Sequence, residues 1–473
     1  MTDRKAKIVC TLGPASASAE MIDRMVRAGM DVARLNFSHG TPAEHAARVA
    51  AVRRASGHHE KPVAILADLQ GPKIRTGELE GGKPVRLRFG QRFVITTSPK
   101  AGTAEGVSTN FTALPGVVHK GDRILLRDGE IALRVLSTRS REVICRVENG
   151  GELGEHQGIN LPGIALKIPS LTPKDRKDLA VALRLGADYV ALSFVRSAAD
   201  VRAGKNAVKR LGKRTPIIAK LEKPQAIDNL DEILSLTDGV MVARGDLGVE
   251  MSLEKVPVVQ KQIIARARNM LVPVITATQM LDSMQENPRP TRAEASDVAN
   301  AIFDGSDALM LSGETAIGHY PLESIEMMDR IIRVAEASVT EPPRPARFTE
   351  LHINEAIAEA ICHAAEELHL KVIAVFTESG SSARLVSKYR PRAPIIAFST
   401  SQETRRLLSL LWGVVPRTIA QVHDIDRLVT AAEKRLLEEK LVRRGDIVGI
   451  VAGTPLGASG TTNLMRLHRI GSP

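Results

Sequence analysis

The clearest pattern in the chain is a series of short apolar runs, each of which stops abruptly at polar residues. Runs of this kind are typical of parallel strands that are covered on both faces. Most intervals between them carry amphipathic, Ala- and Arg-rich stretches of helical period, such as residues 43–54 and 256–269. Alternating strand and helix units of this number predict a (β/α)8 barrel. The eight runs are residues 8–10, 32–35, 63–67, 189–192, 216–219, 239–243, 274–275 and 308–311.

Two further regions differ from this pattern. Residues 72–168 are rich in glycine and carry short alternating segments, which predicts a small all-β domain, a small β-barrel, inserted at the catalytic end of the barrel as a possible lid. The barrel itself then comprises residues 1–71 and 169–340, close to the ~250 residues typical of this fold. A stiff Pro-rich linker at 341–345 precedes residues 346–473, where a helix at 353–368 and strands at 372–376, 395–398 and 447–451 predict an α/β domain with a mostly parallel sheet.

Composition narrows the choice of function. The 473-residue chain is 43% apolar and 25% charged, as expected of a globular protein with two or three domains. Its net charge of +11 would suit a nucleic-acid-binding protein, but an aromatic content of 3% leaves few platforms for base stacking. We therefore favour scattered surface arginines plus a site for anionic metabolites. Three cysteines without metal-type spacing fit a reducing compartment, so we expect a cytoplasmic protein. No apolar run approaches ~18 residues, so we expect no membrane partner, and we expect no nucleic-acid partner either.

Charged and hydroxyl residues follow three successive apolar runs. Lys220 and Glu222 come after the fifth run, Asp246 after the sixth and Thr278 after the seventh. Because the C-terminal ends of barrel strands meet at one face, these side chains should converge. Two carboxylates without His or Cys suit Mg²⁺ or Mn²⁺ rather than zinc, and a lysine suits an anionic substrate.

These residues belong to longer segments through which the chain resembles the pyruvate kinase family over essentially its whole length. The resemblance is specific because the matching segments are long and occur in the family's order. They are 33–40 (ARLNFSHG), 68–76 (DLQGPKIRT), 218–222 (IAKLE), 241–250 (MVARGDLGVE), 276–281 (TATQML) and 311–315 (LSGET).

The resemblance implies transfer of a phosphoryl group from phosphoenolpyruvate to ADP, giving pyruvate and ATP. Lys220, Arg34 and Thr278 would be catalytic. Glu222 and Asp246 would hold Mg²⁺, while Arg34, Gly245, Asp246 and Thr278 would bind phosphoenolpyruvate. The nucleotide would meet Arg75 and the loop Asn36, Phe37, Ser38 and His39. The resemblance leaves Thr278, Ser312 and a water relay as alternative proton donors, and it implies a homotetramer.

Some residues are assigned structural rather than chemical roles. We expect Arg244 to be an ion-pair partner, Glu314 to orient its neighbours, and His39 to hydrogen-bond a loop. Asp128 is expected to mark a hairpin turn, with a lid contact to substrate as the weaker alternative.

Two departures from the family pattern matter. Gln157 precedes the segment Gly158–Gly163, where many relatives carry a lysine, which puts one nucleotide contact in doubt. Lys73 stands where K⁺-dependent relatives carry a glutamate, beside matches to the K⁺ ligands Asn36, Ser38 and Asp68. A tethered ammonium there would replace K⁺, so we expect no K⁺ requirement; the alternative is that Lys73 points to solvent.

A regulatory site is predicted in the C-terminal domain. Thr377, Ser379, Ser381 and Ser382 precede a helix expected to begin near Ala383, and hydroxyls before a helix N-terminus can cradle a phosphate. A second glycine- and hydroxyl-rich loop at 457–463 could close over the same ligand. The short tail favours a sugar monophosphate or AMP over a bisphosphate. The alternative is a plain N-capped turn.

Two other functions are compatible with a barrel of this kind. One is a different phosphoenolpyruvate-using barrel, such as an aldolase or a phosphotransferase with a phosphohistidine domain. The phosphotransferase would need a swivelling histidine domain, and no candidate segment is evident. The other is a non-catalytic scaffold or nucleic-acid binder built on an inactive barrel, which would be expected to have lost Lys220, Glu222 or Asp246, and all three are present.

Overall fold

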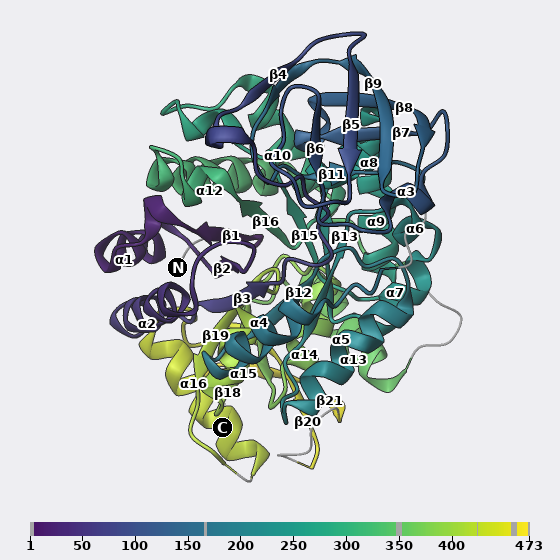
Figure 1. Cartoon of the computed structure of the whole chain (residues 1–473). Coiled ribbons are helices and arrows are strands. Elements are labelled where there is room, and N and C mark those ends of the chain that lie inside the picture. Colours follow the sequence, from purple (N-terminus) through teal and green to yellow (C-terminus); the bar gives the residue numbers. More distant parts are fainter. Residues whose placement is uncertain (1–3, 165–167, 347–351, 423, 456–460, 472–473) are drawn as a thin grey trace.

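The computed structural model describes residues 4–164, 168–346, 352–422, 424–455 and 461–471. Its centre is a closed barrel of eight parallel strands in the order β1-β16-β15-β14-β13-β12-β3-β2 (Figure 1). Every predicted apolar run is one of these strands, so the predicted barrel is confirmed. The strands are β1 (Lys7–Leu12), β2 (Val32–Asn36), β3 (Ala64–Asp68), β12 (Tyr189–Leu192), β13 (Ile217–Leu221), β14 (Gly239–Ala243), β15 (Val274–Ala277) and β16 (Ala308–Leu311).

Helices surround the barrel and cover the outer faces of its strands (Figure 1). Several begin with a threonine whose hydroxyl accepts a backbone N–H while an acidic residue three positions on returns the bond, as at Thr41, Thr172 and Thr291. The helices are α1 (Ala19–Ala28), α2 (Pro42–His58), α4 (Pro173–Arg184), α5 (Ala198–Arg210), α6 (Pro224–Asp228), α7 (Leu230–Leu236), α8 (Arg244–Glu250), α9 (Val256–Asn269), α10 (Arg292–Asp304), α11 (Gly313–Ala316) and α12 (Pro321–Ser338), with 3₁₀ turns η1 (Pro14–Ser16), η4 (Leu253–Lys255) and η5 (Asp282–Gln285).

The chain between β3 and α4 forms the predicted β-insert. It contains a six-stranded sheet, β11-β7-β8-β9-β5-β6, and a two-stranded sheet, β10-β4, around one apolar cluster that includes Phe93. The turn η3 (Arg127–Gly129) joins β7 to β8, with Asp128 at φ +50°, so the predicted turn is confirmed. The other elements are β4 (Val85–Leu87), β5 (Arg92–Thr96), β6 (Gly106–Ser108), β7 (Arg123–Leu126), β8 (Ile131–Thr138), β9 (Glu142–Asn149), β10 (Gly151–Leu153), β11 (Ile159–Asn160), α3 (Leu114–Val117) and η2 (Glu80–Gly82).

The C-terminal domain is the predicted α/β unit. Its five-stranded sheet has the order β19-β18-β17-β20-β21, and only β21 is antiparallel to its neighbour. The elements are α13 (Ile353–Glu367), β17 (Ile373–Phe376), α14 (Ser381–Lys388), β18 (Ile395–Ser399), α15 (Gln402–Leu408), β19 (Val414–Thr418), α16 (Ile425–Glu438), β20 (Ile447–Gly453) and β21 (Thr462–Arg469).

This domain closes the base of the barrel, at the end opposite the β-insert (Figure 1). Leu410 is 1% exposed and packs into the apolar cluster inside the barrel. The Tyr189 hydroxyl donates to the Leu407 carbonyl at 2.7 Å, and Lys388 forms a buried ion pair with Asp307 at 2.8 Å. Apolar packing and buried charge pairs therefore hold the two bodies together. Within the described residues, no helix has the combination of length and apolar character that crossing a membrane requires.

Candidate active site

Lys220 lies at the centre of a charged cluster at the C-terminal mouth of the barrel. Its ammonium lies 2.8 Å from Glu222 Oε1 and 3.3 Å from Asp68 Oδ1, and it donates to Ser193 Oγ at 2.8 Å. Burial alone would lower the pKa of Lys220, but Asp68 and Glu222 outweigh that effect and raise its pKa above the ordinary value. The group therefore remains a fixed positive charge.

Asp68 links this lysine to Arg34 on β2. Arg34 Nε donates to Asp68 Oδ2 at 2.8 Å, and Arg34 Nη1 donates to Thr11 Oγ1 at 2.9 Å. Burial favours the protonated form of Asp68, but Lys220 and Arg34 together hold its pKa below the usual range. Three strand ends, β1, β2 and β3, thus fix the guanidinium at the mouth of the barrel.

Two carboxylates at neighbouring strand ends suit a divalent cation. Glu222 is 1% exposed and accepts the Phe194 N–H at 2.8 Å. Its pKa is raised by burial and by the Asp246 carboxylate, although Lys220 opposes this. Asp246 is half-buried and accepts no hydrogen bond or ion pair from any residue that the structure describes. Two carboxylates, one of them unpartnered among the described residues, are a donor set that suits Mg²⁺ or Mn²⁺.

Thr278 lies in a left-handed backbone conformation, with φ +68°, and Gln279 follows at φ +53°. Such conformations cost of order 1–3 kcal/mol outside glycine and cluster at functional sites. Thr278 Oγ1 accepts the Gly245 N–H at 2.8 Å and donates to the Ala277 carbonyl at 2.7 Å. The Gly245 N–H, expected to face substrate, is therefore occupied by the threonine.

Arg244 holds this strained segment in place. Its guanidinium pairs with Asp297 at 2.7 Å and donates to the Thr278 carbonyl at 2.6 Å. Glu314 also stabilises the backbone near this segment: its two carboxylate oxygens accept the N–H groups of Leu281 and Ser312. The structural roles expected of Arg244 and Glu314 are thus consistent with the contacts.

The predicted nucleotide loop follows β2 directly. Asn36 Oδ1 accepts the Ser38 N–H at 3.1 Å, and Phe37 stacks on His45 at 4.3 Å between centroids. His39 makes the expected hydrogen bond within the loop through its backbone carbonyl, which lies 3.1 Å from Nε2 of His45.

Several cations face this loop. Burial and, after it, Arg75, Lys73 and Arg34 lower the pKa of the His39 imidazole. Lys174 also contributes, and its ammonium donates to the Phe37 carbonyl at 2.7 Å. The loop therefore lies in a positive field that would attract a nucleotide phosphate.

Lys73 and Arg75 belong to the segment that leads into the β-insert. Lys73 is half-buried and its side chain passes close to Gly158, so it does not simply extend into solvent. It lines the same cavity as Asp246. Arg75 Nη1 donates to the His156 carbonyl at 2.9 Å, and the Gln157 N–H donates to Thr76 Oγ1 at 2.8 Å.

The predicted effector loop differs from expectation in two respects. Helix α14 begins at Ser381 rather than near Ala383, because Gly380 adopts the left-handed conformation, φ +89°, that precedes it. Thr377 Oγ1 accepts the Gly380 N–H at 2.9 Å, and Ser382 Oγ shares a 2.6 Å hydrogen bond with Thr462. Ser379 and Ser381 remain the accessible hydroxyls. In the second loop, residues 456–460 lie outside the described residues, so the prediction for 457–463 stays open there.

Sequence reasoning missed several contributors to the site. Phe194, at φ +56°, turns its N–H onto Glu222, and nothing in a phenylalanine signals that role. Lys223 pairs with Glu250 at 2.5 Å, and Asn160 of the β-insert donates to the same carboxylate at 3.0 Å. Ser193 was recognisable, because it ends the fourth barrel strand as the other site residues end theirs.

The closed parallel barrel and the charged cluster at its C-terminal mouth define a (β/α)8-barrel enzyme that acts on an anionic substrate. Family models resolve the class further: the pyruvate kinase barrel domain matches residues 3–325, and the pyruvate kinase alpha/beta domain matches residues 355–468. The chain belongs to the pyruvate kinase family. It accordingly transfers the phosphoryl group of phosphoenolpyruvate to ADP, giving pyruvate and ATP, in a family that generally uses Mg²⁺.

Individual relatives agree with this assignment. A pyruvate kinase from Mycobacterium tuberculosis is 47% identical over 468 residues, which cover 99% of each chain. Pyruvate kinases from Sporosarcina psychrophila and Geobacillus stearothermophilus are 46% and 45% identical over 99% of this chain and 81% and 80% of theirs. The crystal structure of a pyruvate kinase from Cryptosporidium parvum superposes with a TM-score of 0.92 at 37% identity, covering 99% of this chain and 97% of that one.

Proposed function

We propose that Lys220, Arg34 and Thr278 carry the phosphoryl transfer at the barrel mouth. One observation supports this most directly: Lys220 and Arg34, from different strands, meet on the single carboxylate of Asp68. Two cations held by a shared buried anion are positioned before substrate arrives, which is what electrostatic catalysis requires.

Each cation has a distinct part. Phosphoenolpyruvate carries a phosphate and a carboxylate, so its charge must be neutralised before ADP can attack. Arg34 would bind the phosphate through its planar fork of donors. Lys220 would stabilise negative charge on the transferring group and on the enolate oxygen as the bond between them breaks. The enolate then takes a proton and becomes pyruvate.

The substrate carboxylate would be bound beside Thr278. Here the Gly245 N–H must leave Thr278 Oγ1, its partner at 2.8 Å, before it can donate to a carboxylate oxygen. An exchange of one hydrogen bond for a charge-assisted one favours the bound state. The Thr278 hydroxyl would thus keep the Gly245 N–H hydrogen-bonded until the substrate carboxylate replaces it.

Glu222 and Asp246 would hold the divalent cation. When bound, Mg²⁺ or Mn²⁺ supplies positive charge for the oxygens of the substrate. The carboxylates contribute in their own right: Phe194 fixes the orientation of Glu222 through its N–H, and Asp246 is left open toward the cavity.

The ADP phosphates would lie against the loop Asn36, Phe37, Ser38 and His39, with Arg75 beside it. The cations that lower the pKa of His39 support this placement. Because Gln157 stands where many relatives carry a lysine, the nucleotide site of this chain has one positive charge fewer than theirs.

The decisive assay is pyruvate formation from phosphoenolpyruvate and ADP with Mg²⁺, coupled to lactate dehydrogenase. Asp246→Asn keeps the size of the side chain and should abolish most activity, and it should also weaken Mn²⁺ binding measured by titration calorimetry. A variant with normal Mn²⁺ affinity would remove Asp246 from the cation site. Exposed Asp426→Asn serves as the matched control.

We further propose that the reaction is independent of K⁺. Lys73 lies within the field around His39 and lines the cavity that Asp246 also lines. Its ammonium would supply the charge that K⁺ provides elsewhere, near Asn36, Ser38 and Asp68, and would repel the ion itself.

A phosphorylated activator, a sugar monophosphate or AMP, is proposed at the loop Thr377, Ser379, Ser381 and Ser382. The accessible hydroxyls of Ser379 and Ser381, which hydrogen-bond to each other at 3.2 Å at the start of an eight-residue helix, support this. Thr377 and Ser382 would shape the loop.

The family resemblance also suggests a homotetramer. An apolar groove between α10 and α12 supports self-association, because Phe303 is 45% and Val334 is 73% exposed there. Analytical ultracentrifugation of the wild type and of Val334→Glu tests this: a wild-type monomer would refute it.

A further inference from the structure

Three side chains of metal-binding type converge on the outside of the barrel, where helices α1 and α2 lie side by side (Figure 1). Asp23 belongs to α1, His58 is the last residue of α2, and His59 is the C-cap of α2. Among the described residues, this is the one group of three or more His, Cys, Asp or Glu side chains whose donor atoms all lie within 4.8 Å of one another. None of the three takes part in the chemistry proposed at the mouth of the barrel.

Both histidine rings face the same carboxylate oxygen. His58 Nδ1 lies 3.0 Å from Asp23 Oδ1, and His59 Nε2 lies 3.1 Å from it. Consecutive residues of a helix normally point roughly 100° apart. Here the helix ends at His58, so two neighbouring rings reach one point, with their centroids 4.7 Å apart.

His59 has an unsatisfied donor or acceptor in this group. Its Nε2 is buried and, although it lies close to Asp23 Oδ1, it forms no hydrogen bond with any residue that the structure describes. A buried ring nitrogen in this state has lost the hydrogen bonds that water would make. Two ligands of one metal ion show the same arrangement, because each directs its lone pair at the ion and not at the other ligand.

The local charges favour a cation at this position. The nearby imidazole of His58, and after it that of His59, lowers the pKa of Asp23, so the carboxyl group is ionised at neutral pH. The C-terminal end of a helix adds a partial negative charge, and both histidines lie at that end of the 17-residue helix α2.

We propose that Asp23, His58 and His59 form a binding site for a zinc ion. Zn²⁺ binds histidine nitrogen and carboxylate oxygen at about 2.0–2.2 Å in a tetrahedral arrangement, which places the ligand atoms roughly 3.3–3.4 Å apart. The observed distances of 3.0 and 3.1 Å need to widen by only about 0.3 Å. Mg²⁺ does not suit the site, because it prefers six oxygen ligands.

The zinc site uses neutral imidazoles. Each histidine would bind through the nitrogen that now faces Asp23 and would carry its proton on the other ring nitrogen. The fourth position is open to a water molecule, because the His58 side chain is 73% exposed. The same opening gives the ion its path from solvent.

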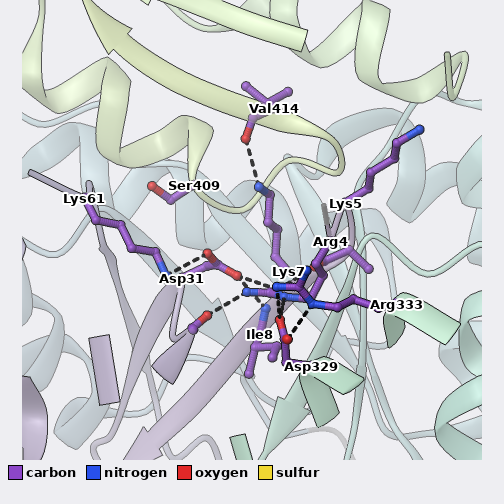
Figure 2. Close-up of polar contacts among 12 residues, drawn as sticks. Arg4, Lys5, Lys7, Ile8, Asp31, Lys61, Asp329, Arg333, Ser409 and Val414 are labelled. Atoms are coloured by element: carbon purple, nitrogen blue, oxygen red, sulfur yellow. Dashed lines mark hydrogen bonds and ion pairs between the residues drawn. The ribbon is translucent and has the colours of Figure 1, made fainter. Parts of the chain in front are cut away.

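A bound ion would connect α1 to the segment that leads from α2 into β3. Further along this segment, Lys61 already forms an ion pair with Asp31 at 3.3 Å, as Figure 2 shows. Zinc between Asp23 and the two histidines would add a second connection. Because the donors come from distant positions in the chain, the folded protein binds the ion more tightly than the unfolded chain does. Zinc should therefore raise the thermal stability of the protein.

The test is thermal melting, followed by circular dichroism, of protein that has been freed of metal with EDTA, desalted and then given ZnCl₂. Excess Mg²⁺ is present throughout to occupy the carboxylates of the active site. Zinc at about 100 times its Kd should raise the melting temperature by at least ~2 °C. In titration calorimetry His59→Gln and Asp23→Asn should each weaken zinc binding at least ~10-fold, since even changes around metal ligands have effects of that size.

His119→Gln is the matched control, because His119 belongs to another exposed pair with an aspartate, Asp122, and this variant should respond to zinc as the wild type does. The proposal is overturned if zinc leaves the wild-type melting temperature unchanged, if His59→Gln and Asp23→Asn keep the full shift, or if Mg²⁺ alone produces it. In the first case the three side chains form only an ion pair at the end of α2. The lactate dehydrogenase-coupled rate of His59→Gln should equal that of the wild type, so none of these outcomes bears on Lys220.

Discussion

Replacement of Lys220 by methionine tests the centre of the proposed mechanism. Methionine keeps the volume of the side chain and removes the charge. The lysine side chain is 12% exposed and contacts Glu222 at 2.8 Å and Asp68 at 3.3 Å. One preorganised electrostatic group contributes about 3–4 kcal/mol to a transition state, so turnover should fall ~100- to 1,000-fold.

A stability cost should accompany the loss of activity. Removal of one partner from a buried ion pair costs about 3–5 kcal/mol, because the remaining charge is left without compensation. In this site Arg34 still neutralises Asp68, and Glu222 can take up a proton, since its pKa is already raised. We therefore expect a folded variant with a lower melting temperature rather than an unfolded one.

The assay is the lactate dehydrogenase-coupled rate at saturating and limiting phosphoenolpyruvate, with circular dichroism to confirm folding. Lys213→Met, at an exposed position, is the matched control and should behave as the wild type does. Lys220→Arg keeps the charge and should recover part of the turnover. Near-normal turnover in a folded Lys220→Met protein would show that the lysine is not a catalytic residue.

Two further predictions concern ions and effectors. In K⁺-free buffer the activity should be close to that with KCl at constant ionic strength, and Lys73→Glu should introduce K⁺ dependence; stimulation of the wild type by more than ~10-fold would contradict this. Saturation curves with glucose 6-phosphate, ribose 5-phosphate, AMP and fructose 1,6-bisphosphate should show activation by a monophosphate that Ser381→Glu abolishes, and persistence of activation in that variant would exclude the loop at 377–382.

The barrel was predictable because its strands are buried on both faces. Such strands appear as continuous apolar runs, and in a closed barrel every run must end at the same mouth. That rule alone brought Lys220, Glu222 and Asp246 together, since it needs only the order of elements and no side-chain detail.

Contacts that depend on backbone conformation could not be predicted from the sequence. The left-handed turns at Phe194 and Thr278 aim an N–H at Glu222 and a hydroxyl at Gly245, but neither residue type favours such a turn. The start of α14 was misplaced for a related reason: hydroxyl residues favour both loops and helix ends, and only the conformation of Gly380 decides between them.

Long-range charge sharing was also beyond sequence reasoning. Asp188 forms ion pairs with Arg53 of the barrel and Arg406 of the C-terminal domain, which are more than 300 positions apart in the chain. The composition showed a surplus of positive charge, and scattered surface arginines were the natural interpretation. In addition, the structure places eight lysines and arginines around one cleft where the barrel base meets the C-terminal domain, and Lys7 is one of them.

Lys7 offers a measurable consequence of that crowding. Burial lowers its pKa to about 8; Asp31 opposes the shift, whereas Arg4 and Lys61 add to it. In the unfolded chain a lysine titrates near ~10.4. Between these two values the unfolded state binds more protons than the folded state, so the contribution of Lys7 to stability rises with pH, by at most ~1.4 kcal/mol per pH unit. Below about pH 8 the full penalty of the buried charge is present.

Replacement of Lys7 by methionine isolates this effect. The variant loses the hydrogen bond to the Val414 carbonyl at every pH, but it no longer carries a charge that must be buried. Melting temperatures measured from pH 7.5 to 10 should therefore rise for the wild type relative to Lys7→Met as the pH passes through 8, because the wild type alone is relieved of its penalty. The control Lys213→Met should track the wild type throughout. A difference between wild type and Lys7→Met that stays constant over this range, or that changes in favour of the variant, would show that the Lys7 ammonium does not carry the predicted burial penalty.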